Sequence, residues 1–423
     1  MDWLREKTVL CTAAFAVPPV AIYAANWLPA IGFLAALALV VIMARSRGQI
    51  PAVPWSALGF LPALLTALVL WAALSAAWAL DPAGSLSTAA KVLLIAVAAF
   101  LLLRGALALD LVARGNVGMA LLLGFLIALA LIGFELASDG MVIRLLRGLS
   151  PEQRAVDLFA RSTSVLALFV WPAGLVIWRK FGWGWALAIY VLTLGIVTQL
   201  TSMASVVALA CGGAVLLLAV ALPRVAGWFL AATIAIMVGV TPLMSVVAPA
   251  TKTALTEAGM TNFSVMHRLV IWDYVGERVA ERPLVGWGMD AARHLGASAE
   301  AVEIITLSGF GPLLGKPISL HPHNGFLQIW LELGVPGMLI LAALLLLAVR
   351  WIMRHIDDRR SLATCLATMA AGLVIMQISY GIWQGWWQSA LWLVAGITLA
   401  VADRRPIGQV DSSARRYREL PIN

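Results

Sequence analysis

Long apolar segments recur along almost the whole chain, and they leave it few ways to fold. Hydrophobic residues make up 62% of the 423 residues and charged residues only 12%, whereas roughly one-quarter of the residues are charged in soluble domains. We expect about twelve segments to cross a hydrocarbon core of roughly 30 Å. None of them alternates in the manner of a transmembrane barrel strand. The sequence therefore predicts an all-α, polytopic membrane protein.

The predicted spans divide the chain into four regions. Residues 1–247 carry spans 1–9, residues 248–323 form one large loop, residues 324–402 carry spans 10–12, and residues 403–423 form a basic tail. Long loops in compact architectures are usually functional. The spans are expected at 8–25, 27–44, 58–79, 92–103, 117–137, 163–178, 185–200, 205–222, 228–247, 326–349, 362–380 and 382–402.

Basic residues predict the orientation, because Lys and Arg near span ends are retained in the cytoplasm. If the N-terminus is inside, 18 of the 29 Lys and Arg residues are cytoplasmic. Both termini are then cytoplasmic, and the large loop lies on the outer side. The net charge of +8 reflects this topology, so we expect no nucleic-acid partner. In the tail, Arg415, Arg416 and Arg418 are expected to touch anionic membrane lipid.

The outer basic residues gather in two loops, and they are candidates for binding phosphate. Ten of the eleven lie in the large loop or in residues 138–162. A guanidinium fork matches phosphate oxygens. We select Arg161, at the edge of a span, and Arg268, on a predicted amphipathic helix at 265–282, as the diphosphate-binding candidates. The alternative is that both side chains reach toward lipid headgroups.

Histidine is concentrated in the large loop, which holds His267, His294, His321 and His323 of the chain's five. Histidine can accept and release a proton near neutrality. A metal site built from His321 and His323 with a third histidine is the alternative. The chain has no His-Glu-x-x-His motif, no Asp-x-Asp motif and no phosphate loop. We therefore predict neither a metal nor a nucleotide cofactor.

The end of the large loop and the next span carry the most specific motifs. His323-Asn324 is followed, after nine residues, by Gly-Val-Pro-Gly at 334–337. Upstream lie Arg-Leu-Val-Ile-Trp at 268–272 and Pro-Leu-Val-Gly-Trp-Gly at 283–288. Together these motifs resemble the superfamily of O-antigen ligases and polymerases. The resemblance covers residues 262–337 at the level of motifs and most of the chain at the level of topology.

The resemblance implies a fold, a reaction and a site. The fold is GT-C-like, with one large periplasmic loop in the inner membrane of a bacterium. The enzyme moves a glycan from undecaprenyl diphosphate to the lipid A core oligosaccharide without metal. A single inverting displacement is our own mechanistic hypothesis for this transfer. His323 matches the proposed base and Arg268 the diphosphate clamp by motif, whereas Arg161 is placed by its position before the sixth span.

The residues around this motif have a physical interpretation of their own. Asn324 can fix the start of the tenth span, and Gly334 and Gly337 would bend that helix or admit a lipid tail. Glu332 is an intramembrane acid that we expect to pair with an arginine. A tryptophan cluster at 383, 386 and 387 is expected to anchor the last span at the membrane interface.

Three alternatives to a ligase remain. An O-antigen polymerase or a protein O-oligosaccharyltransferase would need the same base and clamp. Arg161 is followed by Ser-Thr-Ser and lacks the Pro-Asn of related polymerases, which favours a ligase. A transporter would show ionisable residues at the bilayer midplane and two similar halves, and neither is evident.

Overall fold

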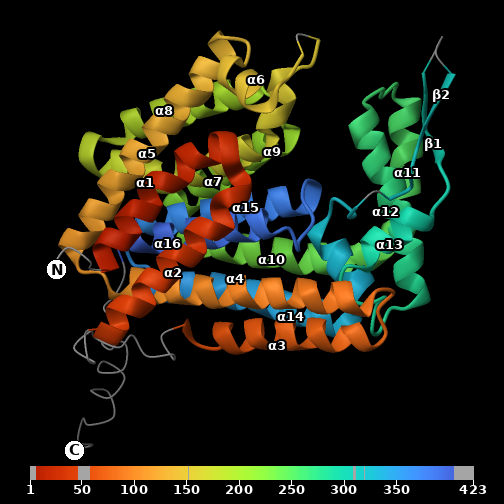
Figure 1. Cartoon of the computed structure of the whole chain (residues 1–423), viewed down its shortest axis with the longest axis horizontal. Helices are drawn as coiled ribbons and strands as arrows, with labels where there is room; N and C mark the ends of the chain where they lie inside the picture. Colours follow the sequence, from red (N-terminus) through yellow and green to blue (C-terminus); the bar gives the residue numbers. More distant parts are fainter. Residues whose placement is uncertain (1–5, 46–57, 151, 308–310, 319, 404–423) are drawn as a thin grey trace, which may run out of the picture.

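The computed structural model describes residues 6–45, 58–150, 152–307, 311–318 and 320–403, and most of them are helical (Figure 1). The helices of the first half are α1 (Glu6–Ala24), α2 (Leu28–Arg45), α3 (Leu61–Leu74), α4 (Pro82–Ala108), α5 (Leu111–Ala137), α6 (Met141–Arg147), α7 (Ala160–Phe181), α8 (Trp183–Thr198) and α9 (Met203–Ala221). The second half has α10 (Pro223–Val240), α11 (Met244–Glu257), α12 (Phe263–Glu281), α13 (Ala291–Ser298), α14 (Gly325–His355), α15 (Arg359–Ile378) and α16 (Gly385–Val401).

The apolar helices confirm a multi-pass membrane protein. In the described part of the chain, eight helical segments are long and apolar enough to cross a membrane, and three shorter apolar helices accompany them. The first of the eight, Glu6–Arg45, contains both α1 and α2. The predicted number of about twelve spans stays a prediction.

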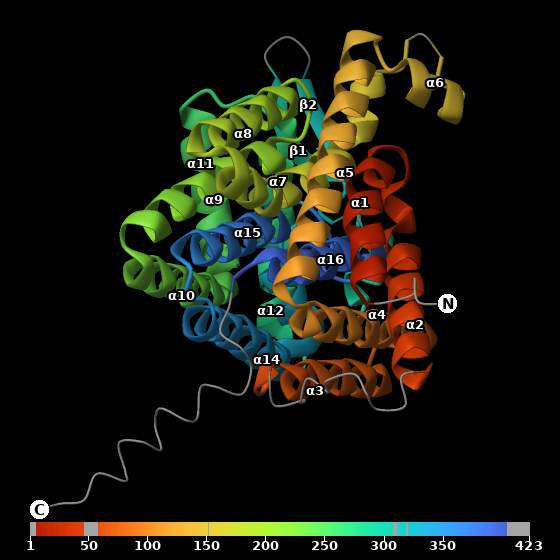
Figure 2. The same cartoon turned by 90° about the vertical axis from the view of Figure 1, so that its left-hand side faces the viewer.

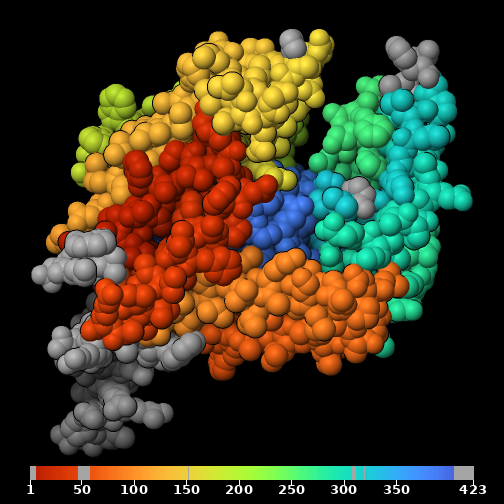
Figure 3. All heavy atoms as spheres, in the orientation of Figure 1, coloured from red at the N-terminus to blue at the C-terminus, as the bar shows by residue number. Residues whose placement is uncertain are grey.

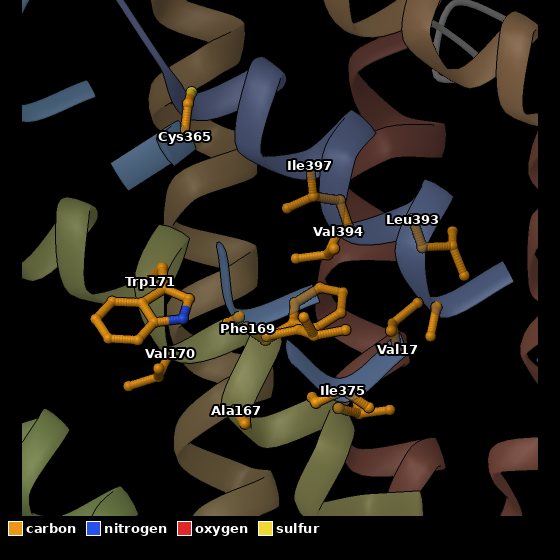
Figure 4. Close-up of a cluster of buried hydrophobic side chains, with 14 of the residues drawn as sticks. Val17, Ala167, Phe169, Val170, Trp171, Cys365, Ile375, Leu393, Val394 and Ile397 are labelled. Carbon is orange, nitrogen blue, oxygen red and sulfur yellow. The ribbon is translucent and has the colours of Figure 1, made fainter. Parts of the chain in front are cut away.

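The centre of the bundle is formed by α7, α15 and α16, with other helices around them (Figure 2). Phe169, Trp171 and Ile375 from α7 and α15 pack there with Val394 and Ile397 of α16 (Figure 4). About four-fifths of the residues in the apolar parts of α7 and α15 are buried. In α4, α5 and α9 the buried share is about one-third to one-half. Burial of these aliphatic and aromatic groups holds α15 in place. Its C-terminal end contributes to the site described below.

The predicted large loop is folded. It contains α11 beyond Ala248, α12, α13 and two antiparallel strands, β1 (Val302–Leu307) and β2 (Gly311–Gly315). These elements, which we call the outer assembly after the side that the basic residues predict for them, stand together beside one end of the bundle (Figure 1). The amphipathic helix predicted at 265–282 is observed as α12, and Asn262 caps it by accepting a hydrogen bond from Val265 N. The hairpin departs from the all-α prediction.

Helix α14 is interrupted inside the apolar segment. Gly334 has φ +61° and ψ −158°, which is not helical, and Pro336 has no N–H to donate. The N–H of Val335 donates instead to the Pro283 carbonyl oxygen at 3.0 Å. A Cβ at Gly334 would lie 2.4 Å from the Leu284 carbonyl oxygen. Glycine is required at 334 by both conformation and space, as the predicted bend implies.

The carbonyl groups freed by this break are bonded by other parts of the chain. Without such partners, each would cost several kcal/mol inside a membrane. The donors are Trp287 N for Leu331 at 2.8 Å, Gly288 N for Glu332 at 2.9 Å and Trp71 Nε1 for Leu333 at 2.8 Å. The two sequence motifs at 283–288 and 334–337 are therefore two sides of one contact.

Candidate functional site

His323 lies at the junction between the outer assembly and α14. Its φ of +54° is in the left-handed region, which is uncommon for a residue other than glycine. On one side, the Pro322 carbonyl oxygen accepts from Trp272 Nε1 at 3.0 Å. On the other, Asn324 begins α14 and accepts from Leu327 N at 2.9 Å, so its predicted capping role is observed. The imidazole is thus carried by backbone that is fixed on both sides.

The ring of His323 is oriented by the turn that follows α15. Its Nδ1 lies 2.5 Å from the Ser379 carbonyl oxygen. A carbonyl oxygen only accepts, so Nδ1 carries the proton and Nε2 keeps a lone pair. Burial, with contributions from Arg268 and His267, lowers the pKa of His323 to about 4, although the bond to Ser379 acts in the opposite direction. At neutral pH the ring is therefore an uncharged proton acceptor.

Arg268 is held beside His323. Its Nε donates to the Ile378 carbonyl oxygen at 3.0 Å, one residue before the carbonyl that orients the imidazole. Its Nη1 donates to the backbone oxygen of Ser264 at 2.9 Å and to the Ser264 hydroxyl. Burial lowers the pKa of the guanidinium, yet arginine remains charged in proteins. The structure brings the predicted base and one predicted cation to adjacent carbonyl groups.

Arg161 lies at the other side of the same α15–α16 connection. It is the second residue of α7, and its Nη1 donates to Asn26 Oδ1 at 2.7 Å. Its guanidinium carbon is 5.5 Å from the centre of the Trp386 ring. Tyr380 donates to the Ala160 carbonyl oxygen at 2.8 Å, beside Arg161. No described hydrogen bond joins Arg161 to His323 or to Arg268, so the structure does not assemble the two arginines into one direct cluster.

The surface is hollowed between α1–α2, α4 and the outer assembly, and C-terminal residues coloured blue form the floor of the hollow (Figure 3). The Ile378 and Ser379 carbonyl oxygens bond to Arg268 and His323, and the Tyr380 hydroxyl bonds to the Ala160 carbonyl oxygen next to Arg161. An anionic substrate bound over this connection would meet cations contributed by two distant parts of the sequence.

Glu332 corrects one prediction, because its partners are not arginines. The carboxylate is fully buried and accepts from Trp383 Nε1 at 2.5 Å, Gln328 Nε2 at 3.0 Å and Asp290 N at 2.8 Å, with Ala292 N at 3.4 Å. It satisfies the start of α13, whose N–H groups need an acceptor. Glu332 therefore ties α13, α14 and the start of α16 together.

The tryptophan cluster also differs from the expectation of interfacial anchoring. Trp387 is fully buried and Trp386 is 5% exposed, and Trp383 bonds to Glu332. The sequence did not predict the bond from Trp383 to Glu332, nor that Tyr380 and the carbonyl groups of Ile378 and Ser379 would be part of the site. A signal existed only for the tryptophans, whose indole N–H groups need partners when buried.

The alternative metal site finds no support in the geometry of the described residues. They contain no group of three or more His, Cys, Asp or Glu side chains that could hold an ion. His267 Nε2 lies 2.8 Å from the Lys316 carbonyl oxygen, and His294 Nε2 lies 3.5 Å from Asp81 Oδ2. Neither is directed to His321 and His323 as a third ligand.

Comparison with known proteins identifies similar proteins of one kind. Residues 186–342 match the family model described as O-Antigen ligase. A protein of Rickettsia conorii named "Putative polysaccharide ligase" is 27% identical over 334 residues, which cover 78% of this chain and 77% of the relative. One of Rickettsia felis with the same name is 28% identical over 337 residues, 78% of each chain. The fold defines a multi-pass membrane bundle with a histidine and an arginine beside one folded assembly. These similarities support an O-antigen ligase-type family.

Proposed function

We propose that this protein is an O-antigen ligase of the bacterial inner membrane, with both termini in the cytoplasm and the site facing the periplasm. It transfers a glycan from undecaprenyl diphosphate to the lipid A core oligosaccharide. The observation that carries the proposal is the orientation of His323. Its Nδ1 bonds to the Ser379 carbonyl oxygen, which leaves the Nε2 lone pair to accept a proton, and Arg268 bonds to the neighbouring carbonyl oxygen of Ile378. A proton acceptor beside a fixed cation suits transfer from a diphosphate leaving group.

The proposed chemistry is a single inverting displacement. A hydroxyl oxygen of the acceptor bonds to the anomeric carbon, and the bond from that carbon to the phosphate oxygen breaks with its electron pair going to the diphosphate. His323 Nε2 takes the hydroxyl proton; an alcohol becomes strongly acidic as its oxygen forms the new bond, so a base with a pKa of about 4 suffices. Arg268 and Arg161 stabilise the charge on the departing diphosphate. The step requires no metal.

An apolar cavity supports a donor with a lipid tail. A space of about 340 Å³ lies between α3, α4, α14, α15 and α16 and is lined almost entirely by hydrocarbon. Its lining includes Met376, Ile382 and Trp383, which lie on either side of Ile378 and Ser379 in the sequence. An isoprenoid chain lying there would present its diphosphate to the site.

The test is glycan transfer by the detergent-solubilised protein, from undecaprenyl diphosphate to purified lipid A core, in the presence of a chelator. Transfer that survives chelation, inverts the anomeric configuration and is lost in His323→Ala supports the proposal. Lengthening of the glycan on the lipid carrier would instead make the protein a polymerase, and transfer to a Ser or Thr of a protein would make it an oligosaccharyltransferase. Retention of configuration would refute the single displacement.

A further inference from the structure

His321 contacts His323 through one defined ring nitrogen. The backbone N–H of His323 donates to His321 Nδ1 at 3.2 Å. An imidazole nitrogen that accepts a hydrogen bond is unprotonated, so the proton of neutral His321 lies on Nε2. The two histidines thus have opposite tautomers, since His323 carries its proton on Nδ1. This assignment follows from the partners alone.

The ring of His321 packs between His323 and the α15–α16 connection. The centroids of the two imidazoles are 4.3 Å apart at an angle of 59°. On the other side, a Cβ at Gly381 would lie 2.9 Å from His321 Cγ. Burial, followed by His323, Arg293 and Arg268, lowers the pKa of His321 to about 3. The ring therefore stays neutral and keeps its acceptor at Nδ1.

The contact falls where the backbone is strained. A left-handed conformation is sterically unfavourable for a non-glycine residue, and His323 adopts it at φ +54°. A different φ would turn the His323 side chain away from the Ser379 carbonyl oxygen. His321 Nδ1 accepts the N–H of the peptide unit that precedes the His323 Cα, so it helps to hold one of the two peptide planes between which that φ is measured.

We propose that His321 is the positioning residue of His323: its Nδ1 accepts the His323 backbone N–H and holds the left-handed backbone that aims the His323 ring. This role rests on the proposed function, in which His323 is the base. His321 itself takes no proton from the acceptor. Its ring acts through the geometry of its neighbour.

Three substitutions separate this role from direct contact with substrate. His321→Asn retains an acceptor near the place of Nδ1, His321→Gln places its amide near Nε2, and His321→Ala removes both. We expect His321→Asn to keep kcat within about threefold, and His321→Gln and His321→Ala to lower kcat by about tenfold or more at unchanged KM, because the base is misplaced while substrate still binds. His294→Asn, on the same outer assembly, is the matched control and should leave both constants unchanged.

A second readout does not depend on turnover. With ¹⁵N-labelled histidine, the nitrogen shifts of the whole protein in detergent should show opposite tautomers for His321 and His323, assigned by single substitutions. The His323 signal should keep its Nδ1–H signature in His321→Asn and lose it in His321→Ala. If wild type transfers no glycan but the tautomers and the Asn rescue of the signal are observed, the proposed function fails while the positioning contact stands.

Two results would overturn the proposal. An active His321→Ala variant with an unchanged His323 signal would show that the contact is dispensable. A variant series in which His321→Gln is active and His321→Asn is not would show that Nε2 contacts the substrate, so that His321 binds rather than positions.

Discussion

Removing the Glu332 carboxylate should strongly destabilise the protein, because it is the acceptor for three close donors. Trp383 Nε1, Gln328 Nε2 and Asp290 N lie within 3.0 Å of its oxygens, and the side chain is fully buried. A buried donor left unsatisfied costs about 1–3 kcal/mol. Part of this is offset because a buried carboxyl group no longer has to be desolvated. For Glu332→Ala we expect a net loss of about 3–5 kcal/mol in the free energy of unfolding.

The conservative variant tests the cause of that loss. Glu332→Gln keeps the shape but replaces one acceptor oxygen by an NH₂ that faces a donor, so we expect a loss of about 1–3 kcal/mol. Glu300→Ala is the control, because Glu300 is an exposed carboxylate of the outer assembly and should change stability by less than about 0.5 kcal/mol. Reversible unfolding in mixed micelles, followed by tryptophan fluorescence, measures all three. A Glu332→Ala variant as stable as Glu300→Ala would refute the reasoning.

Further predictions follow from the break in α14 and from the charges at the site. Gly334→Ala should destabilise by about 1–3 kcal/mol, because its Cβ would lie 2.4 Å from a carbonyl oxygen, whereas Gly174→Ala, with nothing within 4 Å, should unfold at least as late as wild type. Arg268→Ala should lower kcat/KM for glycan transfer by about 100- to 1,000-fold, and Arg161→Ala by less, since Arg161 is exposed and bonds away from His323; equal losses would contradict this ranking. The transfer rate should fall as the pH drops through about 4, the pKa of His323, because protonation removes the Nε2 lone pair; an acid limb near 6.5 would contradict the buried environment. Stability should fall over the same acid range, from about 6.5 down to 4, because the unfolded chain binds the proton more readily than the folded one.

The sequence predicted those parts of the molecule that local patterns determine. Apolar length determines the helices, the spacing of three and four residues determines α12, and an Asn before an apolar run determines the start of α14. The hairpin was missed, although the run from Val302 to Thr306 is rich in β-branched residues, which favour strands.

Half of the site could not be predicted, because it is made of backbone atoms and distant pairs. The carbonyl groups of Ile378 and Ser379 orient Arg268 and His323. Every residue has a backbone carbonyl group, so the sequence does not indicate which ones take part in a site. Trp383 and Glu332 are 51 residues apart, a separation that no periodic pattern reports. The motif glycines predict a bend in the helix. Only the structure shows that this bend packs against residues 283–288.

The break in α14 also constrains the order in which the chain can be assembled. On its own, the stretch from Gly325 to Gly337 would enter a bilayer with the acid Glu332 and several backbone carbonyls unsatisfied, at several kcal/mol each. Most of those groups find their donors in residues 283–292, in a loop made just before α14, and the others are bonded by Trp71, Gln328 and Trp383. We therefore expect the first half of α14 to become a stable membrane segment only once that loop and Trp383 have docked against it.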